Sequence, residues 1–230
     1  MQKYLSKEFF DFFKKLAANN HKDWFDANRK AYEQDVKAPF EKLVDALIFE
    51  LAKIDDRFSQ IKNKDCIFRI NRDIRFAKDK TPYKLNRSAA IAPGGKKDFN
   101  PIGFYFEVGP GGCTFYSGVY MADKDQLALA RNYIAKHNSE LNKIIENKDF
   151  KKYFGEVLGE KQKRLGPDLQ AAGAIQPLIY NAQFYLKHEF SQKLALDENF
   201  VPELIAIWKK SLPFGKYFSE ALHKTKEAKQ

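Results

Sequence analysis

The chain has 230 residues, of which 44% are hydrophobic and 30% are charged. This balance is ordinary for a globular protein and excludes a fibrous or low-complexity chain. The net charge of +10 favours an anionic partner, such as a phosphate group, a nucleic acid or an acidic surface. A lysine-rich surface that serves only solubility is the competing interpretation, but residues 67–87 alone carry half of the net charge.

The two cysteines, Cys66 and Cys113, form neither a CxxC pair nor a disulfide framework, which is typical of a reducing cytoplasm. The N-terminal stretch predicts an amphipathic helix and lacks the apolar core and cleavage site of a signal peptide. No segment approaches about eighteen uncharged apolar residues, so no membrane span is expected. We therefore expect a cytoplasmic protein with no membrane partner.

The first 55 residues predict helices, because their apolar positions recur at helical spacing. Ser6 is placed to cap the first helix and Asp23 to cap the second. Pro39 divides the pattern, since it lacks an amide donor and crowds the preceding turn. A strongly apolar stripe then continues to Ile54.

Residues 65–120 change character, because apolar positions now alternate and glycine and proline mark the turns. Short connections that contain glycine favour antiparallel pairing. Four strands are predicted here and a fifth later in the chain, with the sequences CIFRINRDIRF (66–76), RSAAIAP (87–93), IGFYFEVG (102–109), CTFYSGVY (113–120) and QFYLKHEF (183–190).

The helical period returns in the second half of the chain. Asp123 is placed to cap one helix and Ser139 to begin another. Residues 165–177 predict a long loop, of the kind that is often functional or mobile. Residues 201–212 predict a last helix, which Pro213 ends.

Helices, then strands, then helices with one late strand predict an α+β fold and not alternating βαβ units. The sheet is expected to have about five strands, antiparallel or with mixed pairing, packed by the N-terminal and C-terminal helices. No repeat, linker or low-complexity segment divides the chain. Residues 1–230 are therefore expected to form a single domain, with a frayed tail at 224–230.

The segment from Ile67 to Arg87 carries the densest positive charge. On a strand, Arg72 falls on the apolar face, where an unpaired guanidinium is costly to bury. Either a bulge re-aims Arg72, or it has a buried acidic partner, or the strand ends early; the first two are favoured. Seven cations face two anions here, namely Arg69, Arg72, Arg75, Lys78, Lys80, Lys84 and Arg87 against Asp73 and Asp79.

The polar faces of the predicted strands favour an anion site, because guanidinium groups and phenols fix the orientation of an anion. The expected sheet face carries Arg69, Asp73, Arg75, Tyr105, Glu107 and Tyr116. The candidate ligand-binding residues are Arg69, Arg72, Arg75, Lys80, Lys84, Arg87, Tyr105 and Tyr116. Cross-strand pairing of these charges, with only a packing role, is an equal alternative.

Three functions stay open. The first is binding of a phosphorylated or other anionic ligand, in one version a nucleic acid whose affinity falls steeply with salt. The second is a small hydrolase or transferase in which Asp73 or Glu107 is the general base and the arginines stabilise developing negative charge. The third is a structural protein whose charges pair internally.

No metal site and no cofactor is expected. The sequence contains no HExxH motif, no paired CxxC, no EF-hand loop and no phosphate-binding loop. The four histidines are far apart in the sequence and share no ligand spacing, at positions His21, His137, His188 and His223.

Several motifs together resemble the bacterial family known as domain of unknown function 2461. They are NHKDWFDANRKAYE, FRINRDIRFAKDKTPYKLNRSAAI, GFYFEV and LIYNAQFYL, which occur in the family's order over nearly the whole chain. The family's turn after the arginine-rich strand is matched by Asp79, Lys80, Pro82, Tyr83 and Lys84. Ser117 and Ala122 depart from the family's pattern. The resemblance implies a single cytoplasmic domain and no particular activity.

Overall fold

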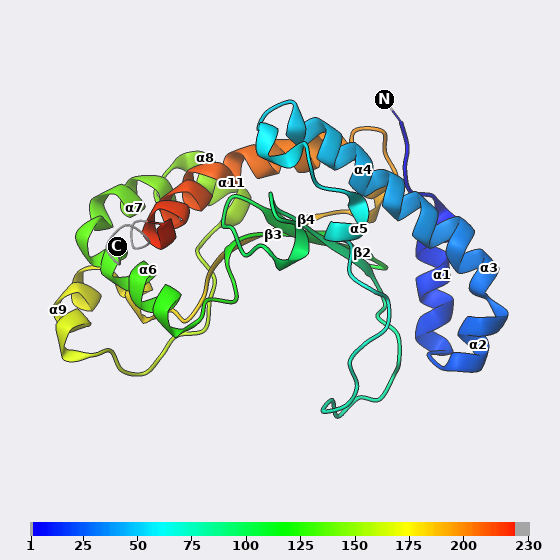
Figure 1. Ribbon diagram of the computed structural model, residues 1–230, viewed down its shortest axis with the longest axis horizontal. Helices are drawn as coiled ribbons and strands as arrows, with labels where there is room; N and C mark the ends of the chain where they lie inside the picture. The colour runs from blue at the N-terminus through cyan, green and yellow to red at the C-terminus, as the bar shows by residue number, and fades with distance from the viewer. Residues whose placement is uncertain (1, 224–230) are drawn as a thin grey trace. The chain divides into compact units, whose positions relative to one another are not determined.

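The structure is a computed structural model that describes residues 2–223 (Figure 1). Two compact units are formed by residues 2–98, 105–115 and 189–206 and by residues 99–104, 116–188 and 207–223. The expected single domain stays a prediction, and the expected tail at 224–230 lies outside the described residues. Within these residues, no helix is both long and apolar enough to cross a membrane.

Helices of the first unit pack their aromatic side chains into a core. The rings of Phe9 and Phe40 stack with centroids 6.5 Å apart, and Phe40 reaches Phe106 at 5.5 Å. All three side chains are fully buried, so their burial holds these helices against the sheet. The helices are α1 (Lys7–Ala18), α2 (Lys22–Ala27), α3 (Arg29–Ala31), α4 (Ala38–Ala52), α5 (Asn63–Cys66) and α10 (Gln192–Ala195).

The expected N-terminal helices are confirmed, with local differences at their ends. Ser6 occupies the N-cap position of α1. The prediction that Asp23 caps α2 is wrong, because His21 is the N-cap and its Nδ1 accepts a hydrogen bond from the amide of Trp24. Pro39 does divide the pattern, since a π-helical turn (Tyr32–Lys37) precedes it and α4 begins with Pro39 in its first turn.

The sheet has four antiparallel strands in the order β1-β2-β3-β4, which confirms the α+β class. The β2 side chains alternate, with Phe104, Phe106 and Val108 buried and Tyr105 and Glu107 partly exposed on the other face. Four of the five predicted strands are therefore present, as β1 (Arg87–Ile91), β2 (Phe104–Gly109), β3 (Gly112–Val119) and β4 (Phe184–Phe190).

The predicted strand at 66–76 is wrong. The chain from 67 to 86 is irregular and pairs only at two isolated antiparallel bridges, Ile67 with Ala89 and Asn71 with Tyr83. The amide of Arg72 donates to the carbonyl of Pro82 at 2.8 Å. Pro82 has no amide hydrogen with which to continue the ladder. The alternating pattern is therefore not sufficient for a strand, because the segment that pairs with residues 70–72 contains Pro82.

The second unit contains α6 (Lys124–Lys136), α7 (Asn138–Ile145), α8 (Lys148–Phe154) and α9 (Pro167–Ile175), and α11 (Phe200–His223) has residues in both units. Asp123 caps α6 as predicted, in a capping box with Gln126. The loop predicted at 165–177 is wrong. Pro167 at the start of α9 and the alanines after it favour a helix.

The predicted end of the last helix at Pro213 is also wrong, because α11 continues through it to His223. A proline inside a helix removes one backbone hydrogen bond and crowds the preceding turn. The apolar stripe continues beyond Pro213 with Phe214, Tyr217 and Phe218, all at most 2% exposed. Burial of these rings offsets the cost of the proline.

Candidate functional site

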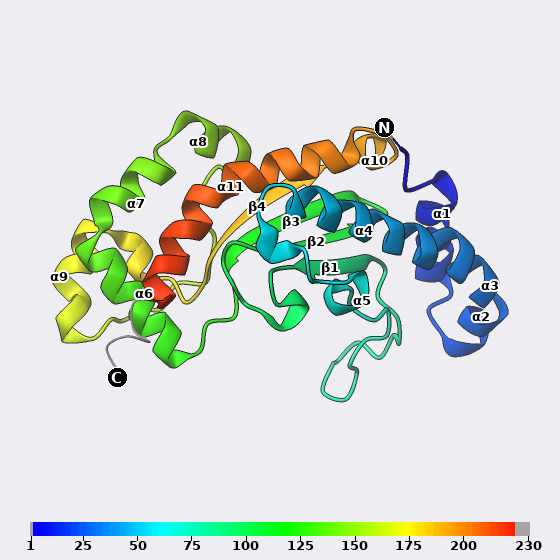
Figure 2. The same cartoon turned by 45° about the horizontal axis from the view of Figure 1, so that its top comes forward.

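The positively charged segment is an ordered loop, residues 67–86, which we call the basic arm. It connects α5 to β1 and extends away from the sheet (Figures 1 and 2). The side-chain amide of Asn20 donates to the carbonyl of Tyr83 at 2.9 Å and accepts from its amide at 3.1 Å. The ring of Tyr83 stacks on Phe25 with centroids 4.1 Å apart. These contacts attach the stem of the arm to the N-terminal helices.

Arg72 cross-links the two sides of the arm. Its guanidinium lies 2.5 Å from the Asp79 carboxylate, 3.2 Å from the Thr81 carbonyl, and within hydrogen-bond reach of the Thr81 hydroxyl. The Thr81 amide and Arg72 together lower the pKa of Asp79 to about 2. An acidic partner for Arg72 was one of the predicted alternatives, but the Asp79 side chain is 60% exposed and not buried.

Arg75 and Asp73 form a second ion pair nearer the tip. The guanidinium donates to both carboxylate oxygens of Asp73, at 2.9 and 2.7 Å. Hydrogen bonds from Arg75 lower the pKa of Asp73. Asp73 is therefore a poor general base, because it is exposed and already satisfied. Lys80 is exposed too and donates to the carbonyl of Ile74 at 3.0 Å.

Arg87, at the start of β1, is in a different environment. Its side chain is 4% exposed, and its guanidinium lies over the ring of Phe40, with the central carbon 5.5 Å from the centroid. One terminal nitrogen donates to the carbonyl of Phe68 at 2.9 Å, while the buried Nε has no partner among residues 2–223. No carboxylate of these residues forms an ion pair with Arg87.

Lys84 lies close to this buried charge. Its ammonium group is over the ring of Phe68, 5.3 Å from the centroid, and the side chain is half-buried. Burial and then the positive charge of Arg87 lower the pKa of Lys84, and Arg69 acts in the same direction. The negative charge of Glu107 opposes the shift. We call Arg69, Lys84 and Arg87 the cation cluster.

A polar group is formed by Asn86, which lies just before β1, with Tyr105 and Glu107 of β2, and Glu107 lies within electrostatic range of Lys84. Oε2 of Glu107 accepts from the hydroxyl of Tyr105 at 2.9 Å and from the side-chain amide of Asn86 at 3.2 Å. The carbonyl oxygen of Asn86 and the hydroxyl of Ser88 are buried and find no partner in the described part of the chain. Such unpaired atoms are costly in a protein interior and indicate a place where a further polar group would be stabilising.

The structure thus separates the predicted site residues into groups. Near the start of β1, Lys84 lies within electrostatic range of Arg69, Arg87 and Glu107, and Glu107 is hydrogen-bonded to Tyr105, whereas the guanidinium of Arg87 lies over Phe40. Arg72, Arg75, Asp73 and Lys80 lie on the arm and not on a sheet face, and Tyr116 belongs to the second unit, where its ring lies 6.2 Å from that of Tyr185. Phe68, Asn86 and Ser88 were missed; the alternation of Lys84, Asn86 and Ser88 was the available signal.

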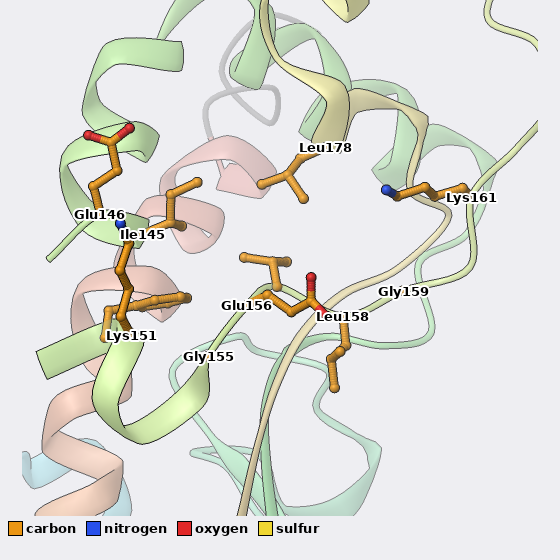
Figure 3. A pocket seen from close by; sticks show the side chains of 11 residues that line it. Ile145, Glu146, Lys151, Gly155, Glu156, Leu158, Gly159, Lys161 and Leu178 are labelled. Atoms are coloured by element: carbon orange, nitrogen blue, oxygen red, sulfur yellow. The ribbon is translucent and has the colours of Figure 1, made fainter. Parts of the chain in front are cut away.

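The second unit contains a pocket of about 390 Å³ (Figure 3). Figure 3 shows Glu146 and Lys151 on one side of it and Lys161 on another. No predicted site residue lines the pocket, whose wall combines apolar side chains with charges of both signs. Its lining residues are Ile145, Glu146, Phe150, Lys151, Gly155, Glu156, Val157, Leu158, Gly159, Lys161 and Leu178. Nothing in this arrangement distinguishes a ligand class.

Metal sites in proteins require a set of ligand side chains close together. Among the residues that the structure describes, no three histidine, cysteine, aspartate or glutamate side chains gather as a metal site would require.

A family model described as conserved hypothetical protein (DUF2461) matches residues 8–217 of the chain. The match includes the basic arm and the cation cluster, and it confirms the resemblance that the sequence motifs predict. No curated protein and no solved structure matches the chain significantly. The description of the family names no activity.

Proposed function

The chain belongs to the DUF2461 family of conserved hypothetical proteins, and we propose that it binds a phosphorylated or other small anionic ligand at the cation cluster. One observation carries the proposal. Arg87 is 4% exposed and, among residues 2–223, has no carboxylate partner. A buried guanidinium without a counter-charge is costly, and an anion would supply the missing charge.

The groups around Arg87 support the same proposal. Burial and then the positive charge of Arg87 lower the pKa of Lys84, so the two positive charges repel one another. A bound anion would reverse this effect and raise the pKa of Lys84. Oε2 of Glu107 already accepts two hydrogen bonds. Its Oε1 is then available to a ligand hydroxyl or amino group, which favours a ligand that carries donors beside its anionic group.

We also propose a cytoplasmic location. Cys66 and Cys113 are both free and buried. Burial raises the pKa of the Cys66 thiol to about 12 and raises the pKa of the Cys113 thiol as well. Two protected thiols that do not pair are typical of a protein from a reducing compartment. The bacterial origin implied by the motifs stays a prediction.

Titration with inorganic phosphate and pyrophosphate, followed by NMR of the backbone amides of residues 84–88, tests the anion site. Arg87→Met should weaken binding about 10- to 100-fold, because it removes a charged hydrogen-bond donor. Lys84→Met and Arg69→Met should also weaken it, and Arg69 is exposed enough to be replaced without disturbing the fold.

Arg75→Met is the matched control, because it removes the same charge from an exposed guanidinium that Asp73 already pairs. Its affinity for phosphate should stay within about 2-fold of the wild type. Equal losses in Arg75→Met and Arg87→Met would mean that phosphate senses only the overall charge. That result would contradict a site at the cation cluster, as would amide shifts that spread evenly over the arm.

A further inference from the structure

Phe76, near the tip of the basic arm, is the most exposed large apolar side chain of the described residues. It is 95% exposed, and the guanidinium of the neighbouring Arg75 lies 5.9 Å from its ring centroid. Large aromatic side chains are normally covered, and one that is held in solvent often marks a contact with another molecule. The part of the chain that the structure describes supplies no surface that covers this ring.

The arm that carries Phe76 is held together by its own contacts. Arg72 joins Asp79 and Thr81 across the arm, and the amide of Lys84 donates to the carbonyl of Ile70 at 2.8 Å. Its stem is fixed by the two hydrogen bonds between Asn20 and Tyr83. Because these contacts order the arm without burying its tip, the ring of Phe76 is presented in a defined place, which lowers the entropy lost when a partner binds.

The charges at the tip select an anionic partner. Lys78 is exposed and makes no hydrogen bond or ion pair with any residue in the range 2–223. Lys80 is exposed and bound only to backbone carbonyls. The two carboxylates of the tip are already engaged by Arg72 and Arg75. The lysine charges near Phe76 are therefore not neutralised by the arm itself.

We infer that the basic arm binds single-stranded nucleic acid, with Phe76 stacking on a base while Lys78 and Lys80 contact phosphates. Single-strand binders combine an aromatic platform with cations that follow the backbone, and stacking tolerates any base because every base has a flat face. This inference goes beyond the proposed function and does not depend on it, since Phe76, Lys78 and Lys80 lie near the tip of the arm, whereas the cation cluster lies at its two ends and at the start of β1.

A nucleic acid fits the tip better than a membrane surface does. Insertion into lipid uses several apolar side chains at one height. Here one ring is exposed, while its apolar neighbours Ile74 and Ala77 are partly covered. Asp79 is exposed and keeps its negative charge at neutral pH, since its pKa is lowered to about 2. An anionic bilayer is negatively charged over its whole surface, so it would repel the Asp79 carboxylate. A flexible strand can instead place its phosphates beside the lysines and away from Asp79.

Fluorescence anisotropy with a labelled oligodeoxythymidine of about a dozen nucleotides tests the inference at several salt concentrations. Phe76→Ala should weaken binding about 5- to 100-fold and leave the dependence of affinity on salt unchanged, because it removes stacking and no charge. Lys78→Gln should instead reduce the salt slope by about one unit. At 95% exposure the Phe76 ring contributes little to the fold, so both proteins should unfold at the wild-type temperature.

Phe49→Ala is the matched control. Phe49 is 63% exposed on α4, and the ammonium group of Lys53 lies 4.2 Å from its centroid, so it offers an exposed ring beside a cation elsewhere in the first unit. Its affinity should stay at the wild-type value. Equal binding by Phe76→Ala and the wild type would overturn the inference. So would a loss that appears only with phosphatidylserine vesicles and not with the oligonucleotide, which would assign the tip to membranes.

Discussion

Arg72 and Arg75 of the basic arm have acidic partners, whereas the arginine at the start of β1 has none among the described residues. On the arm, Arg72 and Arg75 each lie within 2.7 Å of an aspartate and remain partly or largely exposed. At β1, Arg87 is buried with no carboxylate partner in the described residues. Burial and then the charge of Arg87 lower the pKa of the nearby Lys84. The first arrangement stabilises a loop, whereas the second leaves a buried charge that, among the described residues, is offset by the Phe68 carbonyl and the Phe40 ring and by no carboxylate.

This contrast shows that a count of positive charge does not locate a site. A paired, exposed guanidinium contributes shape and little net attraction for a ligand, because its field is largely cancelled and screened. An unpaired, buried one keeps its field and a desolvation cost, which a ligand can relieve. A buried charge without a partner lowers stability, and such a loss of stability is characteristic of functional sites. Paired and unpaired cations of this chain should therefore respond to substitution with opposite sign.

Substitution of Arg72 should have the largest effect on the arm. Arg72→Met removes the links to Asp79 and Thr81 across the arm, so we expect the arm to open more often. Hydrogen exchange of the residue 84 amide, which donates to Ile70, should then be about 5- to 30-fold faster.

Arg75→Met provides the contrast, because it breaks an ion pair whose guanidinium is 76% exposed. Exposed pairs contribute little, so exchange at the residue 84 amide should change by less than about 2-fold. If the two substitutions accelerated exchange equally, the cross-link made by Arg72 would not be what orders the arm.

Substitution of Lys84 should have the opposite sign. Burial and Arg87 lower the folded-state pKa of Lys84, so its protonated form is disfavoured by folding. Lys84→Met should therefore raise the free energy of unfolding at pH 7. The wild type should recover part of this difference as pH rises from the folded-state pKa towards about 10.4, the ordinary value for lysine. Urea unfolding of both proteins at neutral and alkaline pH measures the difference.

Lys78→Met is the control for this comparison, because Lys78 is an exposed lysine of the same segment. Its effect on the free energy of unfolding should be close to zero and should not change with pH in the same window. A loss of stability in Lys84→Met at neutral pH would mean that the contact of Lys84 with Phe68 outweighs the cost of the buried charge.

Much of the fold could be predicted from the sequence, because it depends on local periodicity. The alternation of Phe104, Phe106 and Val108 with polar residues placed β2, and Asp123 with Gln126 formed the expected cap. The predictions failed where packing overrides a local signal. The rings of Phe214, Tyr217 and Phe218 carry α11 through Pro213, and Pro82 denies the arginine-rich segment the neighbour that a strand needs.

The candidate site could be predicted only in outline. The run of cations located the segment, but the sequence does not show which cations have partners. Arg72 and Arg87 are both arginines in the same cationic segment of the sequence. In the structure, Asp79 pairs with Arg72, whereas Arg87 lies over the ring of Phe40. The contributions of Asn86 and Ser88 also depend on burial, which no short pattern around them indicates.

Acidification should have the smallest effect on the stability of the arm, and it tests the pairing of Asp79 with Arg72 directly. The Thr81 amide and Arg72 lower the pKa of Asp79 to about 2, against about 3.9 in an unfolded chain. A lowered carboxyl pKa stabilises the folded arm above about pH 4, and that contribution is lost as pH falls towards 2. NMR titration of the Thr81 amide should show a midpoint near 2.

Asp79→Asn should abolish the transition, and Arg72→Met should move it upward but not fully to 3.9, because the Thr81 amide still donates. A wild-type midpoint near 4 would show that Asp79 is not paired in solution, and the contrast between the arm and β1 would then disappear.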